Sequence, residues 1–316
     1  MKGKEKIGIW MICLIWVLAA GCSHSEDDAV VPVNKDVKTR LLTFTQVGNK
    51  GSRAVLYEDA KNGLKALWKR GDQLECCNLT TLMDDIIASG GISTGTLTAR
   101  DNNVTSIFQG EMTCEQNNQL AVIYPATDFD YELKSGECFA KYTIILSGQD
   151  GTLEKLANSY HYMYGVATVN SVTSSMAEAT GEMKSLLAVC KFSFKDENNN
   201  GISVKKLKIS YGGNGFDGDF GTYPQTANVT CNINQEAVFA DAVRSNDPLI
   251  IRILGSDSQY PKDVYVALLP VTTRTFRFEV TDDNEKVYTG VAKGTLNAGE
   301  FVVASLPLKM KNESGI

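Results

Sequence analysis

The sequence has few of the residues that carry out acid–base or metal chemistry. Only two histidines occur in 316 residues, which excludes most histidine-based metal centres and disfavours histidine-dependent catalysis. Basic residues are not in excess, since 31 Lys and Arg stand against 37 Asp and Glu, for a formal net charge of −6. A nucleic-acid partner held by phosphate neutralisation is therefore not expected. The sequence also predicts no cofactor, no metal site and no enzyme.

Proline is scarce and glycine is not, with seven prolines and 27 glycines. That balance suits a chain with many turns, and the length predicts about two domains.

The N-terminus has the pattern of an export signal. Three early lysines precede an apolar run over residues 7–20, which is too short for a comfortable membrane span. The run ends in Leu18-Ala19-Ala20-Gly21-Cys22, which resembles a bacterial lipobox. The resemblance implies that residues 1–21 are a signal peptide and that Cys22 is lipidated. An ordinary secretory signal with a chance cysteine is the alternative.

Residues 22–40 predict a lipidated leash. Glu26, Asp27 and Asp28 lie close to the lipidated cysteine, which resembles the surface-export signal of Bacteroidetes lipoproteins. A solvated tether has the same composition and is compatible with that signal. The expected location is the outer membrane, at the cell surface, with several acyl chains as the anchor.

The rest of the chain predicts an all-β protein. Period-two alternation and turn signals indicate many short strands, which favours sandwiches or barrels. The clearest predicted strands are 41–47, 120–124, 142–146, 160–169, 188–194, 204–209, 249–254, 264–269, 275–280 and 301–308.

One predicted helix interrupts this pattern. Leu79, Leu82, Met83, Ile86 and Ile87 recur at helical spacing. With Thr80 or Thr81 as a cap and Gly90-Gly91 as a stop, they predict one short surface helix near residues 79–90.

The polar, aperiodic stretch 170–185 predicts the boundary between two domains. The domains are then residues 41–183 and residues 184–316.

Several segments together resemble the fimbrillin family, the type V pilins and pilin-like lipoproteins of Bacteroidales. Residues 68–74, Trp-Lys-Arg-Gly-Asp-Gln-Leu, are similar to the family's Trp-x-x-Gly-Asp-x-hydrophobic stretch. The other segments are the lipobox with its leash, 108–110 with 121–125, 186–194, and 264–270. The resemblance implies two tandem β-sandwich domains similar to transthyretin in topology.

The resemblance also implies assembly by strand addition with other pilin subunits. An arginine-cleaving protease would remove the first strand, and a strand from the next subunit would fill the groove. Arg53, in the loop after strand 41–47, is the favoured cleavage point, and Arg40 is a poorer one because the strand would stay in place. The donor-strand candidates are Val302, Ala304, Leu306 and Leu308, although Pro307 suits an edge strand and 301–308 fits equally well as the last strand of its own domain.

Two loop motifs are interpreted as structural. Residues 213–218 match G-x-G-x-x-G, but no helix pattern follows to aim N–H groups at a phosphate. Residues 196–201 match half of a calcium loop, but Leu207 stands where a bidentate glutamate is needed. A hairpin turn between strands 188–194 and 202–209 is expected instead.

Six cysteines follow Cys22, at positions 76, 77, 114, 138, 190 and 231. Mostly free thiols are expected, with a bridge from Cys76 or Cys77 to Cys114 or Cys138 as the alternative. Cys190 is expected in a core as a small hydrophobe.

An aromatic stripe offers a second function. Tyr160, Tyr162 and Tyr164 are expected on one face of a strand, where they would stack on sugar rings or, more commonly, pack against the sheet. His161, between them, is interpreted as structural. The leading function is thus a fimbrial subunit or accessory pilin in adhesion, with a host or bacterial surface as a further partner. The alternative is a non-polymerising surface lipoprotein that binds glycan or peptide.

Overall fold

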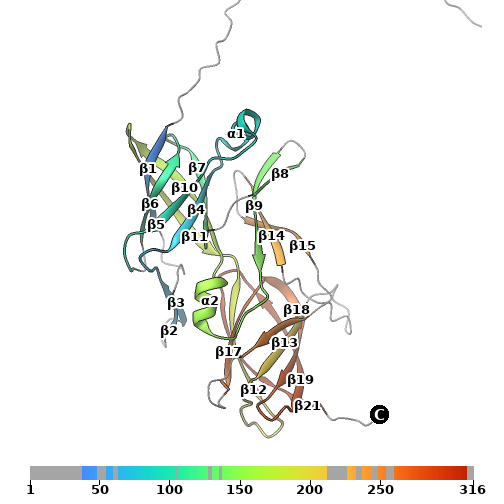
Figure 1. Cartoon of the computed structure of the whole chain (residues 1–316). Helices are drawn as coiled ribbons and strands as arrows, with labels where there is room; N and C mark the ends of the chain where they lie inside the picture. The colour runs from blue at the N-terminus through green and yellow to red at the C-terminus, as the bar shows by residue number, and fades with distance from the viewer. Residues whose placement is uncertain are drawn as a thin grey trace, which may run out of the picture. The chain divides into compact units, whose positions relative to one another are not determined.

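The protein is described from a computed structural model. It describes residues 38–47, 55–59, 63–103, 106–126, 130–134, 137–211, 226–232, 237–243, 248–253 and 260–311. These ranges contain many strands and two short helices (Figure 1). The prediction of an all-β protein is confirmed.

Seven strands of the first half close into a barrel, in the order β1-β11-β10-β7-β4-β5-β6 with β6 paired back to β1. The two expected facing sheets of this half are therefore joined by continuous hydrogen bonding. The strands are β1 Thr39–Gln46, β4 Gln73–Asn78, β5 Thr94–Ala99, β6 Ile107–Thr113, β7 Gln119–Tyr124, β10 Met163–Val172 and β11 Met176–Ser185.

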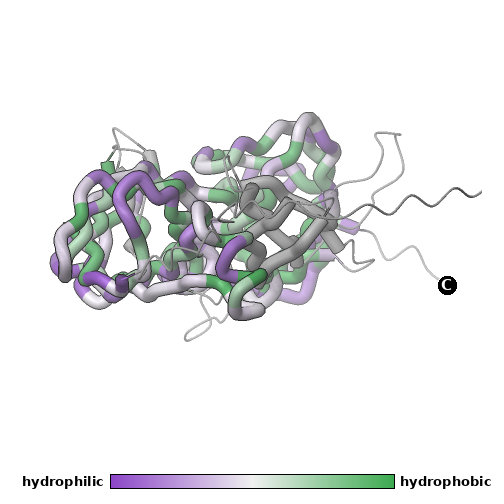
Figure 2. The backbone as a smooth tube through the Cα atoms, turned by 90° about the horizontal axis from the view of Figure 1, so that it is seen from above, coloured by the Kyte–Doolittle hydropathy of each residue, from purple (hydrophilic) through white to green (hydrophobic). Residues whose placement is uncertain are grey.

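The barrel interior is filled by alternate side chains of these strands. Successive residues of a strand point to opposite faces, and hydrophobic and hydrophilic stretches are interspersed along the tube in Figure 2. Trp68 lies between strand β3, Gly63–Leu67, and strand β4, and its side chain is fully buried in the barrel interior. Its ring meets Phe108 and Tyr124 edge-on, at centroid distances of 4.8 and 5.0 Å.

The second half contains two sheets that share a core. One is β17-β12-β20 and the other is β16-β13-β18-β19-β21. Their bounds are β12 Ala188–Lys195, β13 Lys206–Tyr211, β16 Leu249–Arg252, β17 Asp263–Leu268, β18 Val271–Thr281, β19 Val287–Leu296, β20 Phe301–Pro307 and β21 Lys309–Met310.

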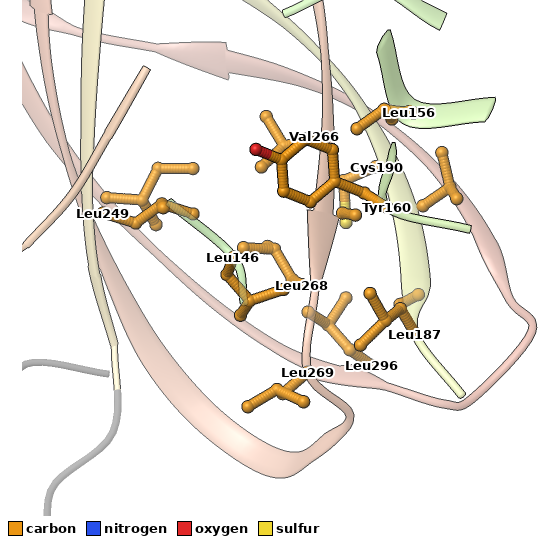
Figure 3. Close-up of a cluster of buried hydrophobic side chains, with 14 of the residues drawn as sticks. Leu146, Leu156, Tyr160, Leu187, Cys190, Leu249, Val266, Leu268, Leu269 and Leu296 are labelled. Atoms are coloured by element: carbon orange, nitrogen blue, oxygen red, sulfur yellow. The ribbon is translucent and has the colours of Figure 1, made fainter. Parts of the chain in front are cut away.

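Aromatic rings from both sheets meet in this core. Phe192 of β12 packs edge-on against Phe278 of β18, with ring centroids 5.1 Å apart. At another part of the same cluster, the Tyr160 ring lies close to Val266 and Cys190 (Figure 3).

Strands from the two predicted domains also share a sheet. Strand β9, Glu137–Ile145, pairs antiparallel with β14, Thr226–Asn232, through seven residue pairs. Strands β8, Asp130–Lys134, and β15, Ala237–Val243, lie at its edges. Separate folding of 41–183 and 184–316 stays a prediction, and it would require this ladder to break.

The stretch 170–185 is not an aperiodic connection. It contains the end of β10 and all of β11, which form a hairpin in the barrel wall. The sequence looks aperiodic because the outward positions after Met176 are polar and the first two inward positions, Ala177 and Ala179, are only alanines. The chain passes to a new sheet after β11, since β11 ends at Ser185 and β12, the first strand of the next sheet, begins at Ala188.

The predicted helix is present as α1, Leu82–Ser89, and Gly90 ends it in the left-handed conformation at φ 70°. Thr81 occupies the N-cap position, as predicted, but its side chain accepts no capping hydrogen bond, and its Oγ1 donates to Asp85 Oδ2 at 2.8 Å instead.

A second helix, α2 Leu153–Ser159, corrects the prediction of a single helix. Thr152 Oγ1 caps it by accepting from the Lys155 N–H at 3.1 Å. Apolar residues at 153, 156, 157 and 160 carry the signal for it, but seven residues are too few for a periodic pattern to stand out. Neither helix in the described part of the chain is long and apolar enough to cross a membrane.

Candidate functional site: the first strand of the barrel

Strand β1 closes the barrel. It runs antiparallel to β6 on one side and parallel to β11 on the other. Since β6 and β11 are joined through β1, removal of β1 would leave an open six-stranded sheet with two unpaired edges. We call β1 together with the residues that contact it the β1 site.

Large side chains of β1 fill the barrel where the neighbouring strand is small. Leu42 and Phe44 point inward and are essentially unexposed. Their partners on β11 are Ala177 and Ala179. Bulk on one strand opposite alanine on the next gives close packing without overlap, so β1 supplies much of the barrel's apolar filling here.

Gly110 of β6 lets strands β5 and β6 approach closely beside β1. It pairs with Leu42 of β1. A Cβ atom at Gly110 would lie 2.0 Å from the backbone oxygen of Thr96 on β5, which leaves no room for a side chain. The glycine of the 108–110 motif therefore has a packing role in the β1 site.

A buried hydrogen bond fixes the end of β1. Gln46, the last residue of the strand, accepts a hydrogen bond from Trp68 Nε1 through its Oε1 at 2.8 Å. Both side chains are buried. An indole N–H buried without an acceptor is costly, so the tryptophan of the 68–74 motif requires an acceptor at this position of β1.

A buried arginine fixes the start of β1. The Arg40 guanidinium pairs with Glu115 at 2.9 and 3.2 Å and donates from Nε to the Thr173 backbone oxygen at 2.7 Å. It also donates to the backbone oxygen of Cys114. Arg40 is 7% exposed, so this charge needs all of these acceptors. Arg40 therefore ties β1 to the segments that follow β6 and β10.

Burial also shapes the titration of groups around the barrel. It raises the pKa of the Cys114 thiol, an effect that Arg40 partly offsets. Burial likewise raises the pKa of Asp72, which follows Gly71 in the turn before β4. Asp72 Oδ2 accepts from the Lys69 N–H at 2.7 Å, so the Gly-Asp part of the motif builds a turn.

Of the predicted lipidation and cleavage residues, only Arg40 lies in the part of the chain that the structure describes. Cys22 and Arg53 fall outside the described residues. Arg40 lies within β1, where its side chain is buried. Cleavage after Arg40 would therefore require the start of the strand to leave the barrel first.

The predicted donor residues belong to β20 and the residue after it. Strand β20 pairs in parallel with β12 through seven residue pairs, from Val189–Phe301 to Lys195–Pro307. Val302, Ala304 and Leu306 pack against the core, and Leu308 is buried. In this chain, strand 301–307 is an edge strand of its own sheet, and its role as a donor stays a prediction.

The tyrosine stripe does not form a surface platform. Tyr160 and Tyr164 are buried and Tyr162 is half-buried. Tyr160 ends α2 instead of lying in β10, and its hydroxyl donates to the Ser147 backbone oxygen at 2.5 Å. His161 is buried near the Tyr124 ring. The sugar-stacking interpretation of these tyrosines is therefore wrong.

The described cysteines are buried. Cys76, Cys114 and Cys190 are free thiols, which excludes the alternative bridges from Cys76 and those to Cys114. Burial raises the pKa of Cys190 to about 12, so it behaves as a small hydrophobe. The side chains of Cys138 and Cys231 lie outside the described ones.

The half calcium loop is a tight turn. Asp196 Oδ1 accepts from the N–H groups of Asn198 and Asn200 at 2.9 and 2.7 Å, and these bonds lower the pKa of Asp196. The turn leads from β12 in one sheet to β13 in the other, so the two strands do not form the expected hairpin. Residues 213–218 lie outside the described residues. Among the residues that are described, no group of three His, Cys, Asp or Glu could hold a metal ion.

Taken together, the described residues define an all-β protein with a barrel and a two-sheet sandwich. No protein-family model and no curated protein matches the sequence. A proposed cell adhesion protein from Bacteroides ovatus has a similar structure, with a TM-score of 0.50 and 12% identity over 87% of this chain and 96% of that chain. A proposed cell adhesion protein from Bacteroides uniformis gives a TM-score of 0.49 and 12% identity over 86% and 96%. The similarity to the first protein is one of fold, and it agrees with the resemblance to fimbrillins.

Proposed function

We propose that the chain is a surface lipoprotein of the fimbrial type, a pilus subunit or accessory pilin that acts in adhesion. Its lipid is attached at Cys22 and holds it at the outer membrane. The fold that it shares with a proposed adhesion protein from Bacteroides ovatus supports this function, and it agrees with the prediction that the chain is not an enzyme.

The observation that carries the proposal is the position of β1. The strand ends at Gln46, the next strand is β2, Val55–Asp59, and Arg53 lies between them in the sequence. A cut after Arg53 would therefore separate β1 and the lipidated leash from everything that follows. The barrel would then offer the edges of β6 and β11 to a strand from another subunit.

The experiment follows cleavage and assembly of lipid-free precursor. An arginine-specific protease is added to the folded protein, the products are identified by mass spectrometry, and oligomers are sought on gels without heating. Cleavage after Arg53 with release of the β1 segment supports the proposal, and SDS-resistant oligomers would show in addition that a second copy can supply the replacing strand. An Arg53→Ala variant, which should give neither, is the control. Resistance of folded wild type at Arg53 would contradict it.

A non-polymerising surface lipoprotein is the second candidate. The parallel pairing of β20 with β12 favours it, because a strand held in its own sheet is not free to fill a neighbour. In that case the β1 segment stays with the cut protein, and binding to glycan or peptide arrays is the activity to measure.

A further inference from the structure

We propose that the β1 site selects its occupant by two buried polar contacts, and that the matching strand comes from a protein other than this chain. The required pattern is a cation, two large apolar residues at positions +2 and +4, and a hydrogen-bond acceptor at +6. This inference rests on the proposed function, in which another strand replaces β1.

The pattern follows from the four inward residues of β1. Arg40, Leu42, Phe44 and Gln46 are spaced by two and are the buried positions of the strand. The outward positions between them are exposed or half-buried, so they impose little on an occupant. The site therefore contacts four inward side chains of a seven-residue strand, and these four determine whether a strand fits.

The two polar positions discriminate most strongly. Apolar packing at Leu42 and Phe44 is not directional, and other residues of similar volume would serve there. At one end, however, Trp68 Nε1 needs an acceptor. At the other, Glu115 and the backbone oxygens of Cys114 and Thr173 converge on a single cation. A strand without these groups leaves the buried indole N–H of Trp68 and the backbone oxygen of Cys114 unpaired, whereas the Glu115 carboxylate, 41% exposed, remains accessible to water.

The polar contacts also fix the register. A slip by one residue would turn the inward face outward. A slip by two would keep the apolar face inward but would set an apolar side chain against Trp68 Nε1 and displace the cation from Glu115. Only one register places both the cation and the acceptor on their partners. In that register the strand runs parallel to β11.

The C-terminal segment of this chain lacks the pattern. At the required spacing, the predicted donor residues Val302, Ala304, Leu306 and Leu308 are all apolar. No window of residues 297–316, in either direction, places Lys or Arg and an acceptor around two apolar residues. The window from Leu306 to Asn312 comes nearest, with an acceptor but no cation. The C-terminal segment of a second copy, cut after Arg53 and so without its own β1, is therefore a poor donor for the first.

The test measures how long the β1 site keeps strands of different sequence. A protease site that is absent from the chain is inserted between residues 48 and 53 of the full protein, so that the cut does not depend on Arg53. After cleavage, release of the β1 segment is followed by size exclusion and mass spectrometry. The urea concentration is set so that the native segment has a measurable half-life.

The expected order of half-lives is specific. Gln46→Leu and Arg40→Leu segments should leave roughly tenfold faster or more, the effect of about one unpaired buried group. A segment that carries residues 302–308 in place of 40–46 should leave faster still. Thr45→Ala, at an exposed position of the same strand, is the matched control and should behave like the native segment.

A double-mutant cycle separates the hydrogen bond from general destabilisation. Trp68→Phe removes the buried donor. In that background, Gln46→Leu should therefore shorten the half-life of the bound β1 segment by a smaller factor than it does in the wild-type protein. Arg40→Lys should be retained longer than Arg40→Leu. Equal half-lives for native, Gln46→Leu and Arg40→Leu segments would overturn the inference, as would native-like retention of the 302–308 segment. Failure of Arg53 cleavage in the natural chain would leave these half-lives unaffected and would count against the proposed function alone.

Discussion

Lys191 Nζ lies 3.0 Å from Glu58 Oε1, although the two residues are 133 positions apart. Glu58 belongs to β2, Val55–Asp59, which forms a hairpin with β3, Gly63–Leu67. Tyr265 of β17 donates its hydroxyl to the same carboxylate at 2.7 Å, and Leu56 of β2 is buried in the core cluster of the sandwich. The strand that follows Arg53 in the sequence is therefore held by strands of the second half, so a cut after Arg53 would break the covalent link between β1 and β2 and leave β2 in place.

The attachment of the β2–β3 hairpin should weaken in acid. The Tyr265 hydroxyl, and then Lys191, hold the pKa of Glu58 below its ordinary value of 4.5. A lowered carboxylate pKa contributes stability that is present above the ordinary value and is lost as the pH falls through the folded pKa. Amide hydrogen exchange in residues 55–59 should therefore accelerate, relative to the global rate, below about pH 4.5.

The matched variant for this prediction is Glu58→Gln. It should exchange faster than wild type at neutral pH, by an amount equivalent to about 1 kcal/mol or less for a partly exposed pair, and should lose the acid dependence. Glu285→Gln, which removes an exposed pair with Lys205, is the control and should leave the hairpin unchanged. An unaltered acid response in Glu58→Gln would assign the effect to another group.

Truncation of the inward side chains of β1 should destabilise the barrel strongly. Leu42→Ala and Phe44→Ala each remove a buried side chain that fills the space beside alanines of β11. Each should lower the free energy of unfolding by about 2–5 kcal/mol, through lost burial and the cavity that remains. Urea denaturation of lipid-free protein measures this. Thr45→Ala, on the outer face of the same strand, should cost well under 1 kcal/mol, and a similar loss for all three variants would contradict the inward placement.

Gly110→Ala should be destabilising despite its small size. The added Cβ would lie 2.0 Å from the Thr96 backbone oxygen, so β5 or β6 must shift. A loss of about 1–3 kcal/mol is expected from such overpacking. Gly294→Ala is the comparison, because a Cβ there meets nothing closer than Phe276 at 4.0 Å. Equal melting temperatures for the two variants would show that the strands are not as close as described.

Cys190 should not react in the folded protein. Its thiol is buried and its pKa is raised to about 12, first by burial and then by Glu300. At pH 8 almost none of it is thiolate, the form that reacts. Labelling with an alkylating agent, located by mass spectrometry, should therefore be negligible in buffer and complete in guanidinium. A Ser305→Cys variant, at an exposed position, is the positive control.

Lipid should be attached to Cys22. The lipobox residues 18–22 after a basic and apolar leader carry this prediction. Cells fed a palmitate analogue should label the wild-type protein and not Cys22→Ala. Equal labelling of both would mean that the leader is an ordinary secretory signal.

Local sequence was enough to predict most strands and one helix. Alternation placed strand 188–194 within β12 and 264–269 over β17, because each strand has one face in a core and the pattern is therefore written in its residues. It failed where a strand had little to bury with large side chains. Strand β11, with inward Ala177 and Ala179, looked like a linker because its contribution to the core is the space that it leaves for Leu42 and Phe44.

The sequence by itself determined that the chain is all-β and that Leu42 and Phe44 share the buried face of the first strand. It also singled out residues 68–74, with Trp68, as a motif similar to that of the fimbrillins. Only the tertiary structure decided that β1 closes a barrel, that Arg40 and Gln46 are buried at its two ends, and that β20 is held by β12. The physical reason is the range of the interactions. Alternation is a property of neighbours in sequence, whereas Gln46 meets Trp68 across 22 residues and Arg40 meets Glu115 across 75, and such pairings depend on how the whole chain packs.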